Sequence, residues 1–147
     1  GGLEKNHDGV ISSDPQNHEM MVKERMEKVQ RVANYIPELQ VNGPEKGKLL
    51  VVGWGGTYGH LLSAVQEVRA EGIDVSFAHF DYILPLPKNT TEVFEKFDKI
   101  LVCELNSGQF VNYLRGVLPQ FKYEQFNKVQ GQPFLVQEIT TAIKENF

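Results

Sequence analysis

The chain has 147 residues, of which 41% are hydrophobic, 23% charged and 10% aromatic, a composition of globular rather than disordered proteins. Fifteen Lys and Arg residues against 19 Asp and Glu residues give a net charge of −4 without a basic block, which excludes a nucleic-acid footprint and a polybasic membrane anchor. The single cysteine, Cys103, excludes a disulfide framework, a cysteine-based zinc site and an iron–sulfur cluster held within this chain, and it fits a reducing compartment.

The N-terminal part, residues 1–47, is predicted to be an irregular lead-in followed by one amphipathic helix. Residues 1–14 are polar and rich in turn formers. Asp14-Pro15 is a typical helix start, because the aspartate accepts a hydrogen bond from a free N–H and proline at the first position loses none. We expect the helix to end before Pro37, since the residue that precedes a proline disfavours the α conformation. Its apolar stripe, which needs a surface to bury against, comprises Val22, Met26, Val29, Ala33 and Ile36.

The chain is expected to be a piece of a longer polypeptide. It begins Gly1-Gly2-Leu3 without an initiator methionine, and its opening residues lack the apolar region of a signal peptide. It also has no apolar run near the ~20 residues that span a bilayer. Gly43-Pro44 marks a linker, after which a compact domain is predicted over residues 48–147.

Residues 48–147 alternate between predicted strands and predicted helices. The unbroken apolar run at Lys48–Gly53 is typical of a parallel strand that is covered on both faces. Such alternation predicts an α/β fold, with a parallel sheet and helices on both of its faces. We expect further strands at 73–80, 99–103 and, in a stretch rich in Phe and Tyr, 121–126, with helices at 61–71, 91–97, 109–118 and around Ile139, Ala142 and Ile143.

A glycine-rich turn between the first strand and its helix is the strongest local motif. It comprises Gly53, Trp54, Gly55, Gly56, Thr57, Tyr58 and Gly59. Its amides could hold a phosphate at the helix N-terminus, with Asp81 on a ribose hydroxyl, as in a free-standing Rossmann-like dinucleotide-binding module. However, the third glycine misses the G-x-G-x-x-G spacing by one residue, and Asp81 follows Gly53 by 28 residues instead of about 20. The spacing therefore favours a structural or interface turn over a nucleotide site.

A second candidate loop follows the strand expected at 99–103. It contains Glu104, Asn106, Gly108 and Gln109, and it lies where a parallel strand meets the next helix. The carboxyl edge of such a sheet is where α/β proteins bind ligands and partners. Two interpretations stay open for these residues: a loop that faces a ligand or partner, and the capped start of a helix with Asn106 or Ser107 as the cap.

The remaining histidines and the cysteine do not indicate a catalytic or metal site. His7, Asp8 and His18 lack the i, i+4 spacing that places two histidines on one helical face, so we interpret them as an exposed polar lead-in. His79, in the middle of a strand, is predicted to be a hydrogen-bonded core residue, and Cys103 an inert buried thiol. The sequence contains no nucleophile elbow, P-loop lysine or facing carboxylate pair, so spacing predicts no complete active site.

An ordered set of short motifs resembles the alpha subunits of 2-oxoacid:ferredoxin oxidoreductases, and most of all those of the 2-oxoglutarate type. The resemblance covers essentially the whole chain. Its motifs are Gly2-Leu3-Glu4, His7-Asp8-Gly9, Asp14-Pro15, His18, Met20-Met21-Val22, Lys23-Glu24-Arg25, Val52–Gly59, Leu84-Pro85-Leu86-Pro87, Val102–Gln109 and Gly131-Gln132-Pro133-Phe134.

This resemblance implies a fold and a parent enzyme. The implied fold is a three-layer α/β/α sandwich like the transketolase C-terminal domain, whose mostly parallel sheet has one antiparallel edge strand. The implied parent complexes are cytoplasmic and use thiamine diphosphate, magnesium and iron–sulfur clusters. They oxidatively decarboxylate a 2-oxoacid, form an acyl-coenzyme A and reduce ferredoxin.

The resemblance also implies an architectural role for this segment. It contains neither a cysteine set nor a Gly-Asp-Gly motif for diphosphate and magnesium, so no catalytic or metal-binding residue is predicted within it. The implied partners are the thiamine-diphosphate-binding domains and the beta subunit of the same complex, with ferredoxin reached through that complex. The loops expected to face them are Gly53–Gly59 and Glu104–Gln109.

Overall fold

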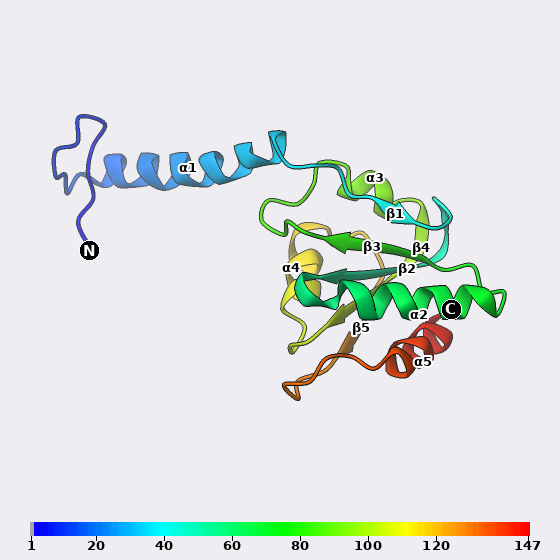
Figure 1. The fold of residues 1–147 in the computed structure, drawn as a ribbon. Coiled ribbons are helices and arrows are strands. Elements are labelled where there is room, and N and C mark those ends of the chain that lie inside the picture. The colour runs from blue at the N-terminus through cyan, green and yellow to red at the C-terminus, as the bar shows by residue number, and fades with distance from the viewer. Residues whose placement is uncertain (1) are drawn as a thin grey trace.

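The computed structural model describes residues 2–147, which form a five-stranded sheet with helices on both faces and a long N-terminal helix that projects from it (Figure 1). The strands are β1 (Val41–Asn42), β2 (Gly47–Trp54), β3 (Ser76–Phe80), β4 (Phe97–Glu104) and β5 (Tyr123–Asn127). The helices are α1 (Pro15–Arg31), α2 (Tyr58–Ala70), α3 (Thr90–Phe94), α4 (Gln109–Val117) and α5 (Val136–Asn146). Each helix of this described part is too short or too polar to cross a membrane.

The sheet has the strand order β1-β3-β2-β4-β5. Strands β3, β2, β4 and β5 are parallel, and the short edge strand β1 pairs antiparallel with β3, with Val41 opposite Ala78. This confirms the expected mostly parallel sheet with one antiparallel edge strand. The aromatic stretch expected at 121–126 is indeed a strand, because β5 pairs with β4 from Tyr123 to Asn127.

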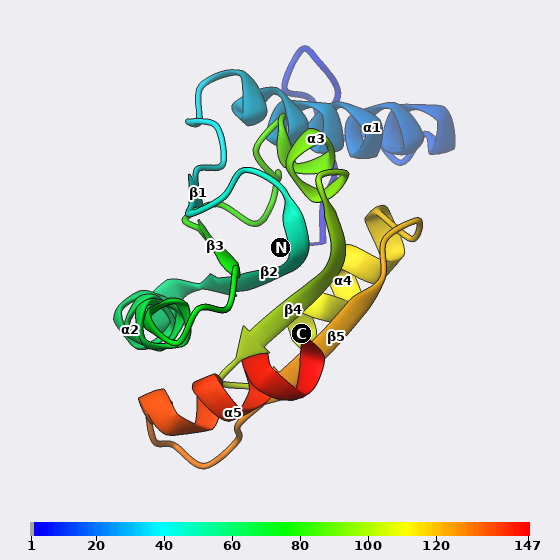
Figure 2. The same cartoon turned by 90° about the vertical axis from the view of Figure 1, so that its right-hand side faces the viewer.

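The sheet is the middle of three layers (Figure 2). Alternate residues of a strand face opposite sides, so Leu50 and Val52 of β2 pack with α3 and α4, while Leu49 and Val51 pack with α2 and α5. All four of these side chains are fully buried. The near-continuous apolar sequence of the central strands follows from burial on both faces, as the run at Lys48–Gly53 predicts.

Several predicted element boundaries were wrong, including the starts of α2 and β4, which begin at Tyr58 and Phe97 instead of 61 and 99. Local hydrogen bonds or strand pairing explain three others. Helix α1 stops at Arg31 and tightens into a 3-10 turn, in which the Tyr35 N–H donates to the Val32 carbonyl (2.9 Å), so it does not reach Pro37. Strand β3 begins at Ser76 instead of 73, because the Ile73 N–H closes the end of α2 on the Val68 carbonyl (3.3 Å). Helix α3 ends at Phe94, and Phe97 already pairs with Gly47 as the start of β4.

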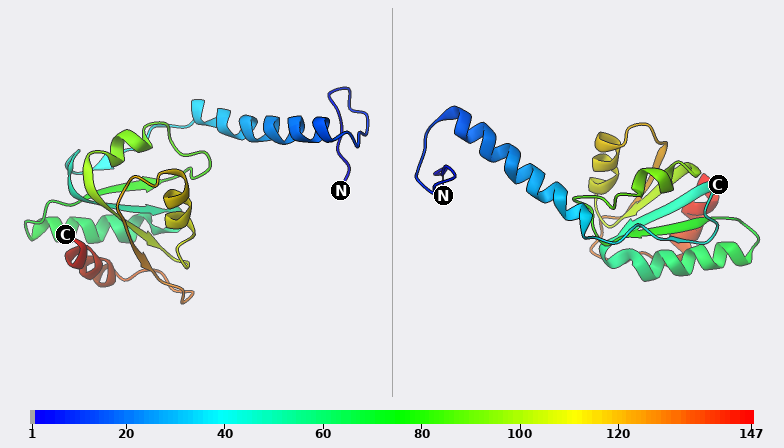
Figure 3. Two further views of the ribbon diagram at one scale, coloured as in Figure 1. Left: turned by 180° about the vertical axis from the view of Figure 1, so that it is seen from behind. Right: turned by 90° about the horizontal axis from the view of Figure 1, so that it is seen from above.

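Helix α1 extends away from the sheet, as views from behind and from above show (Figure 3). Every residue of α1 is at least partly exposed, so the apolar stripe predicted for it lies uncovered in the described part of the chain. Residues 2–14 fold back against the far end of α1. In contrast, Leu39 is buried in the core beside Val41, so the chain rejoins the sheet before the Gly43-Pro44 turn.

Candidate functional site at the carboxyl edge of the sheet

The carboxyl ends of β2 and β4 lie where the order of the strands reverses, because β3 and β4 lie on opposite sides of β2. From β2 the chain passes through α2 to β3 on one side, and β4 lies on the other side of β2. In open α/β sheets ligands and partners bind at such a topological switch point. The two segments predicted from sequence, Gly53–Gly59 and Glu104–Gln109, lie at this edge. The first spans the end of β2 and the start of α2, and the second spans the end of β4 and the start of α4.

The glycine-rich turn is held by its own contacts. A Cβ on Gly53 would overlap the Leu61 side chain and lie 2.6 Å from Thr57 Oγ1, so only glycine lets α2 pack this close to β2. The buried Thr57 hydroxyl donates to the Trp54 carbonyl (2.9 Å) and closes the turn. Gly55 has a φ of +60°, which glycine adopts without strain. A Cβ on Gly56 or Gly59 would meet open space, so this side of the turn is accessible.

The loop after β4 is the capped start of helix α4. The Glu104 carboxylate is completely buried and accepts hydrogen bonds from the backbone N–H groups of Phe110 (2.9 Å) and Val111 (2.8 Å). The Asn106 side-chain oxygen accepts from the N–H groups of Gly108 (2.8 Å) and Gln109 (2.9 Å). The free N–H groups of this helix start are therefore used within the chain and are not offered to an anion.

Glu104 thus points into the protein instead of toward a partner, and its role as a cap was missed from sequence. A glutamate at the end of an apolar strand has no pattern that distinguishes a solvated carboxylate from a buried one. The only sequence signal for this cap is the spacing between Glu104 and Phe110, which follows six residues later at the start of α4 and donates its N–H to the carboxylate.

Two of the predicted loop residues, Trp54 and Gln109, line one groove at the switch point. The groove has a volume of about 190 Å³, and its other walls are Ile83, Leu84, Phe110 and Tyr113. The Trp54 ring packs edge-on against Phe110, with 6.4 Å between ring centroids. Leu84 is 61% exposed, so the apolar wall of the groove faces solvent in this chain. No spacing in the sequence indicates that Ile83, Leu84 and Tyr113 lie together here, although Leu84-Pro85-Leu86-Pro87 is one of the motifs that carry the family resemblance.

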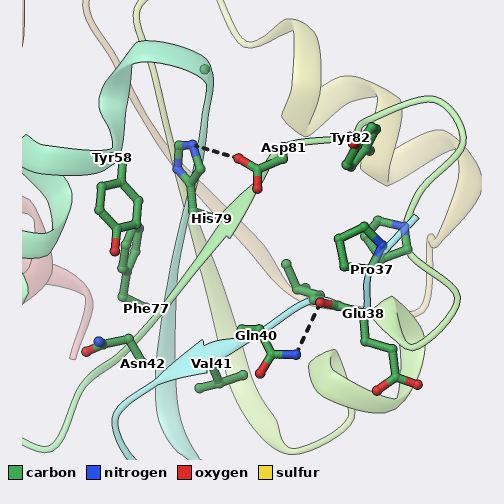
Figure 4. A pocket seen from close by; sticks show the side chains of 13 residues that line it. Pro37, Glu38, Gln40, Val41, Asn42, Tyr58, Phe77, His79, Asp81 and Tyr82 are labelled. Atoms are coloured by element: carbon green, nitrogen blue, oxygen red, sulfur yellow. Dashed lines mark hydrogen bonds and ion pairs between the residues drawn. The ribbon is translucent and has the colours of Figure 1, made fainter. Parts of the chain in front are cut away.

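A second, larger hollow of about 520 Å³ lies beside β3, on the other side of the glycine-rich turn (Figure 4). In it His79 lies between Tyr58 and Asp81, with its Nε2 3.9 Å from Asp81 Oδ1. Asp81 is 77% exposed. Within residues 2–147 the buried Nδ1 of His79 has no hydrogen-bond partner, so the prediction of a hydrogen-bonded core histidine was wrong for this atom. Burial lowers the pKa of His79, which favours the neutral ring.

The other candidates from sequence have structural roles. Cys103 is fully buried, and burial raises the pKa of its thiol far above the usual range, which makes it unreactive. His7 pairs with Glu24 (3.1 Å) and His18 with Glu4 (3.1 Å) on the surface of the lead-in. In the part of the chain that the structure describes, no three His, Cys, Asp or Glu side chains gather into a group that could hold a metal ion.

The arrangement of the sheet defines the class of domain. A transketolase from a split gene superimposes on 73% of the chain and 41% of its own length with a TM-score of 0.56, at 13% identity. The 2-oxoglutarate:ferredoxin oxidoreductase from Magnetococcus marinus, solved with 2-oxoglutarate, coenzyme A and succinyl-CoA bound, matches 99% of the chain and 26% of its own chain with a TM-score of 0.88 and 28% identity. The fold is therefore that of a transketolase C-terminal-like domain.

The sequence comparisons match the chain to alpha subunits of 2-oxoacid oxidoreductases. No family model matches the chain. The 2-oxoglutarate oxidoreductase subunit KorA of Mycobacterium tuberculosis is 38% identical over 150 residues, which cover 98% of the chain and 22% of KorA. The alpha subunit of 2-oxoacid:ferredoxin oxidoreductase 1 from Aeropyrum pernix is 32% identical over 97% of the chain and 23% of its own length. The chain is a homologue of 2-oxoacid:ferredoxin oxidoreductase alpha subunits and spans less than a quarter of these relatives, in their C-terminal part.

Proposed function

We propose that this chain is the C-terminal domain of the alpha subunit of a 2-oxoglutarate-type 2-oxoacid:ferredoxin oxidoreductase. The parent complex, placed in the cytoplasm, oxidatively decarboxylates a 2-oxoacid to an acyl-coenzyme A and reduces ferredoxin. The support is homology over 98% of the chain to a subunit named 2-oxoglutarate oxidoreductase, together with the TM-score of 0.88 to a 2-oxoglutarate:ferredoxin oxidoreductase. The predicted boundary between residues 47 and 48 moves toward the N-terminus, because Leu39 and β1 already belong to the core and the sheet. In this proposal residues before Leu39 join the domain to the rest of the polypeptide, and residues 39–147 form the transketolase C-terminal-like unit.

The cofactors of the parent enzyme belong to other domains in this proposal. Thiamine diphosphate with magnesium needs anion-binding and carboxylate ligands, and an iron–sulfur cluster needs several exposed thiolates. These residues do not fit such groups, because the N–H groups at the start of α4 are held by Glu104 and Asn106 and the one thiol, Cys103, is buried. We assign no catalytic step to this chain.

The role proposed for the domain is to hold its neighbours together through the carboxyl edge of the sheet. The observation that carries this role is the groove in which Trp54 and Gln109 meet the exposed Leu84. An apolar groove that opens to solvent at the carboxyl edge of an α/β sheet is a typical place for a partner to bind. The partners are the thiamine-diphosphate-binding domains and the beta subunit of the same complex.

The enzymatic part of the proposal is tested by turnover. The full-length alpha subunit together with its beta subunit should reduce a viologen acceptor when given 2-oxoglutarate and coenzyme A. The 147-residue chain alone should show no turnover under the same conditions. Activity of the isolated chain would contradict the architectural role, and inactivity of the full complex with every 2-oxoacid tried would contradict the family activity.

The groove is tested by comparing two substitutions. Leu84→Asp places a charge in the groove at an exposed position, so it should weaken association of alpha with beta by roughly tenfold or more while leaving the melting temperature nearly unchanged. Asn106→Ala removes a helix cap instead, so it should lower stability by about 1 kcal/mol and leave association unchanged. Association is measured by calorimetry. Equal effects of both variants on it would show that the groove is not an interface.

The alternative function, that of a free-standing dinucleotide-binding module, has less support than the oxidoreductase subunit. The relatives are named as oxidoreductase subunits, and Asp81 lies near His79 at the edge of the second hollow. A rise in melting temperature on addition of NADH would restore that interpretation, because a ligand that binds only the folded state stabilises it.

A further inference from the structure

We infer that the apolar face of α1 is a docking strip for the preceding part of the same alpha-subunit polypeptide. This inference rests on the proposed function and specifies one contact within it. The strip consists of Val22, Met26 and Val29 on α1 and Val32 at the start of the 3-10 turn that follows, which recur at spacings of four and three. These side chains are 38%, 65%, 42% and 43% exposed, respectively.

Helix α1 needs such a partner to be stable as a helix. It has 17 residues and no buried side chain among them, and its contacts within the described chain are mainly those to its own N-terminal loop. In proteins most of the stability of a helix comes from tertiary packing of its amphipathic face. A bare strip of valine and methionine is therefore more consistent with a covered surface than with a solvated one.

The pose of α1 is shared with a longer relative. The match to the Magnetococcus marinus enzyme covers 99% of this chain, α1 included, with a TM-score of 0.88. A helix directed elsewhere in that structure would remove its residues from the superposition and lower this value. The same pose is thus held in a polypeptide of which this chain covers only 26%, so most of that polypeptide is available to cover the strip.

The N-terminal loop indicates the direction from which the covering segment comes. The Glu4 carboxylate accepts two hydrogen bonds from the Arg25 guanidinium, at 2.9 and 3.0 Å, which fixes residues 2–14 against α1. A preceding domain would be attached at this far end of the helix. Attachment gives it a high effective concentration at the strip, which a separate subunit lacks.

Hydrogen exchange of the full-length alpha subunit, prepared without the beta subunit, tests the inference. The amides of α1 should be protected in the wild type, and Met26→Glu should speed their exchange by roughly tenfold or more, because it places a charge in the covered strip. Arg31→Gln lies on the opposite side of α1 from Val22, Met26 and Val29 and changes the net charge by the same one unit as Met26→Glu, so it serves as the matched control and should leave the exchange unchanged. If Met26→Glu is not recovered as folded protein, Met26→Ala should show the same direction of change.

Three results would overturn the inference. Exchange of α1 that is equally fast in the wild type and in Met26→Glu would show that nothing covers the strip. Protection that arises only on addition of the beta subunit would assign the strip to that subunit, and protection that disappears on dilution would assign it to a second copy of alpha. Turnover of the wild-type complex is measured separately, so failure of this inference is distinguishable from failure of the proposed function.

Discussion

Glu104 shows how a single buried carboxylate can organise the edge of the sheet. It ends β4 inside the protein, and its two oxygens accept the N–H groups of Phe110 and Val111 at the start of α4. Negative charge at the N-terminus of a helix is favourable, and both acceptors of the carboxylate are satisfied. The carboxylate therefore joins strand and helix, and the neighbouring Gln109 is held at the groove as a consequence.

Glu104→Gln should destabilise the chain. The amide keeps one acceptor but turns its NH2 group toward a backbone N–H, so one buried donor loses its partner, at a cost of about 1–3 kcal/mol. Urea unfolding of the variant measures this loss. Glu67→Gln, on the exposed face of α2, is the control and should stay within about 0.5 kcal/mol of the wild type. Equal stability of the two variants would show that the cap contributes nothing.

At the scale of elements, the N-terminal loop and α1 form one unit through charged pairs instead of apolar packing. The hydrogen bonds from Arg25, and next that from His18, lower the pKa of Glu4 from 4.5 to about 2. A carboxyl group whose pKa is lower in the folded than in the unfolded state stabilises the folded contact at any pH above its unfolded pKa. That stabilisation is lost as the pH falls through the folded pKa. The attachment of the loop to α1 is thus complete near neutral pH and is lost between pH 4.5 and about 2.

The carboxyl carbon of Glu4 should therefore titrate in NMR spectra with a midpoint near pH 2. Arg25→Gln removes the main partner, so the midpoint should rise toward 4.5. Lys23→Gln is the matched control, because Lys23 pairs with Glu27 and not with Glu4. An unchanged midpoint in Arg25→Gln would contradict the contact between Glu4 and Arg25.

At the scale of the whole molecule, the chain presents two uncovered apolar surfaces in different directions. One is the groove of Trp54, Leu84 and Gln109 at the carboxyl edge of the sheet, and the other is the strip on α1, which projects away from the sheet (Figure 1). A domain with two such surfaces is suited to contact two neighbours at once. This geometry supports the proposed role of the domain, which is to hold its neighbours together.

Local sequence determined the elements and the class of fold. The apolar run at Lys48–Gly53, the Asp14-Pro15 helix start and the close approach that requires Gly53 are each decided by residues near one another in the chain. Periodicity reports which faces are buried, so the alternation of strands and helices was enough to predict a parallel sheet covered on both faces. The family motifs added the antiparallel edge, which periodicity could not supply because β1 has only two residues.

Only the tertiary structure decided the composition of the candidate site. Trp54 ends β2, Gln109 begins α4 and Leu84 lies in the loop between β3 and α3. They share a groove because the strand order places β2 between β3 and β4. The same holds for the burial of Glu104 and for the unpaired Nδ1 of His79 in residues 2–147, since both depend on what packs against them from elsewhere in the chain. Spacing in the sequence shows which residues are neighbours along the backbone. The site depends on residues that are distant in the sequence and become neighbours only when the sheet forms.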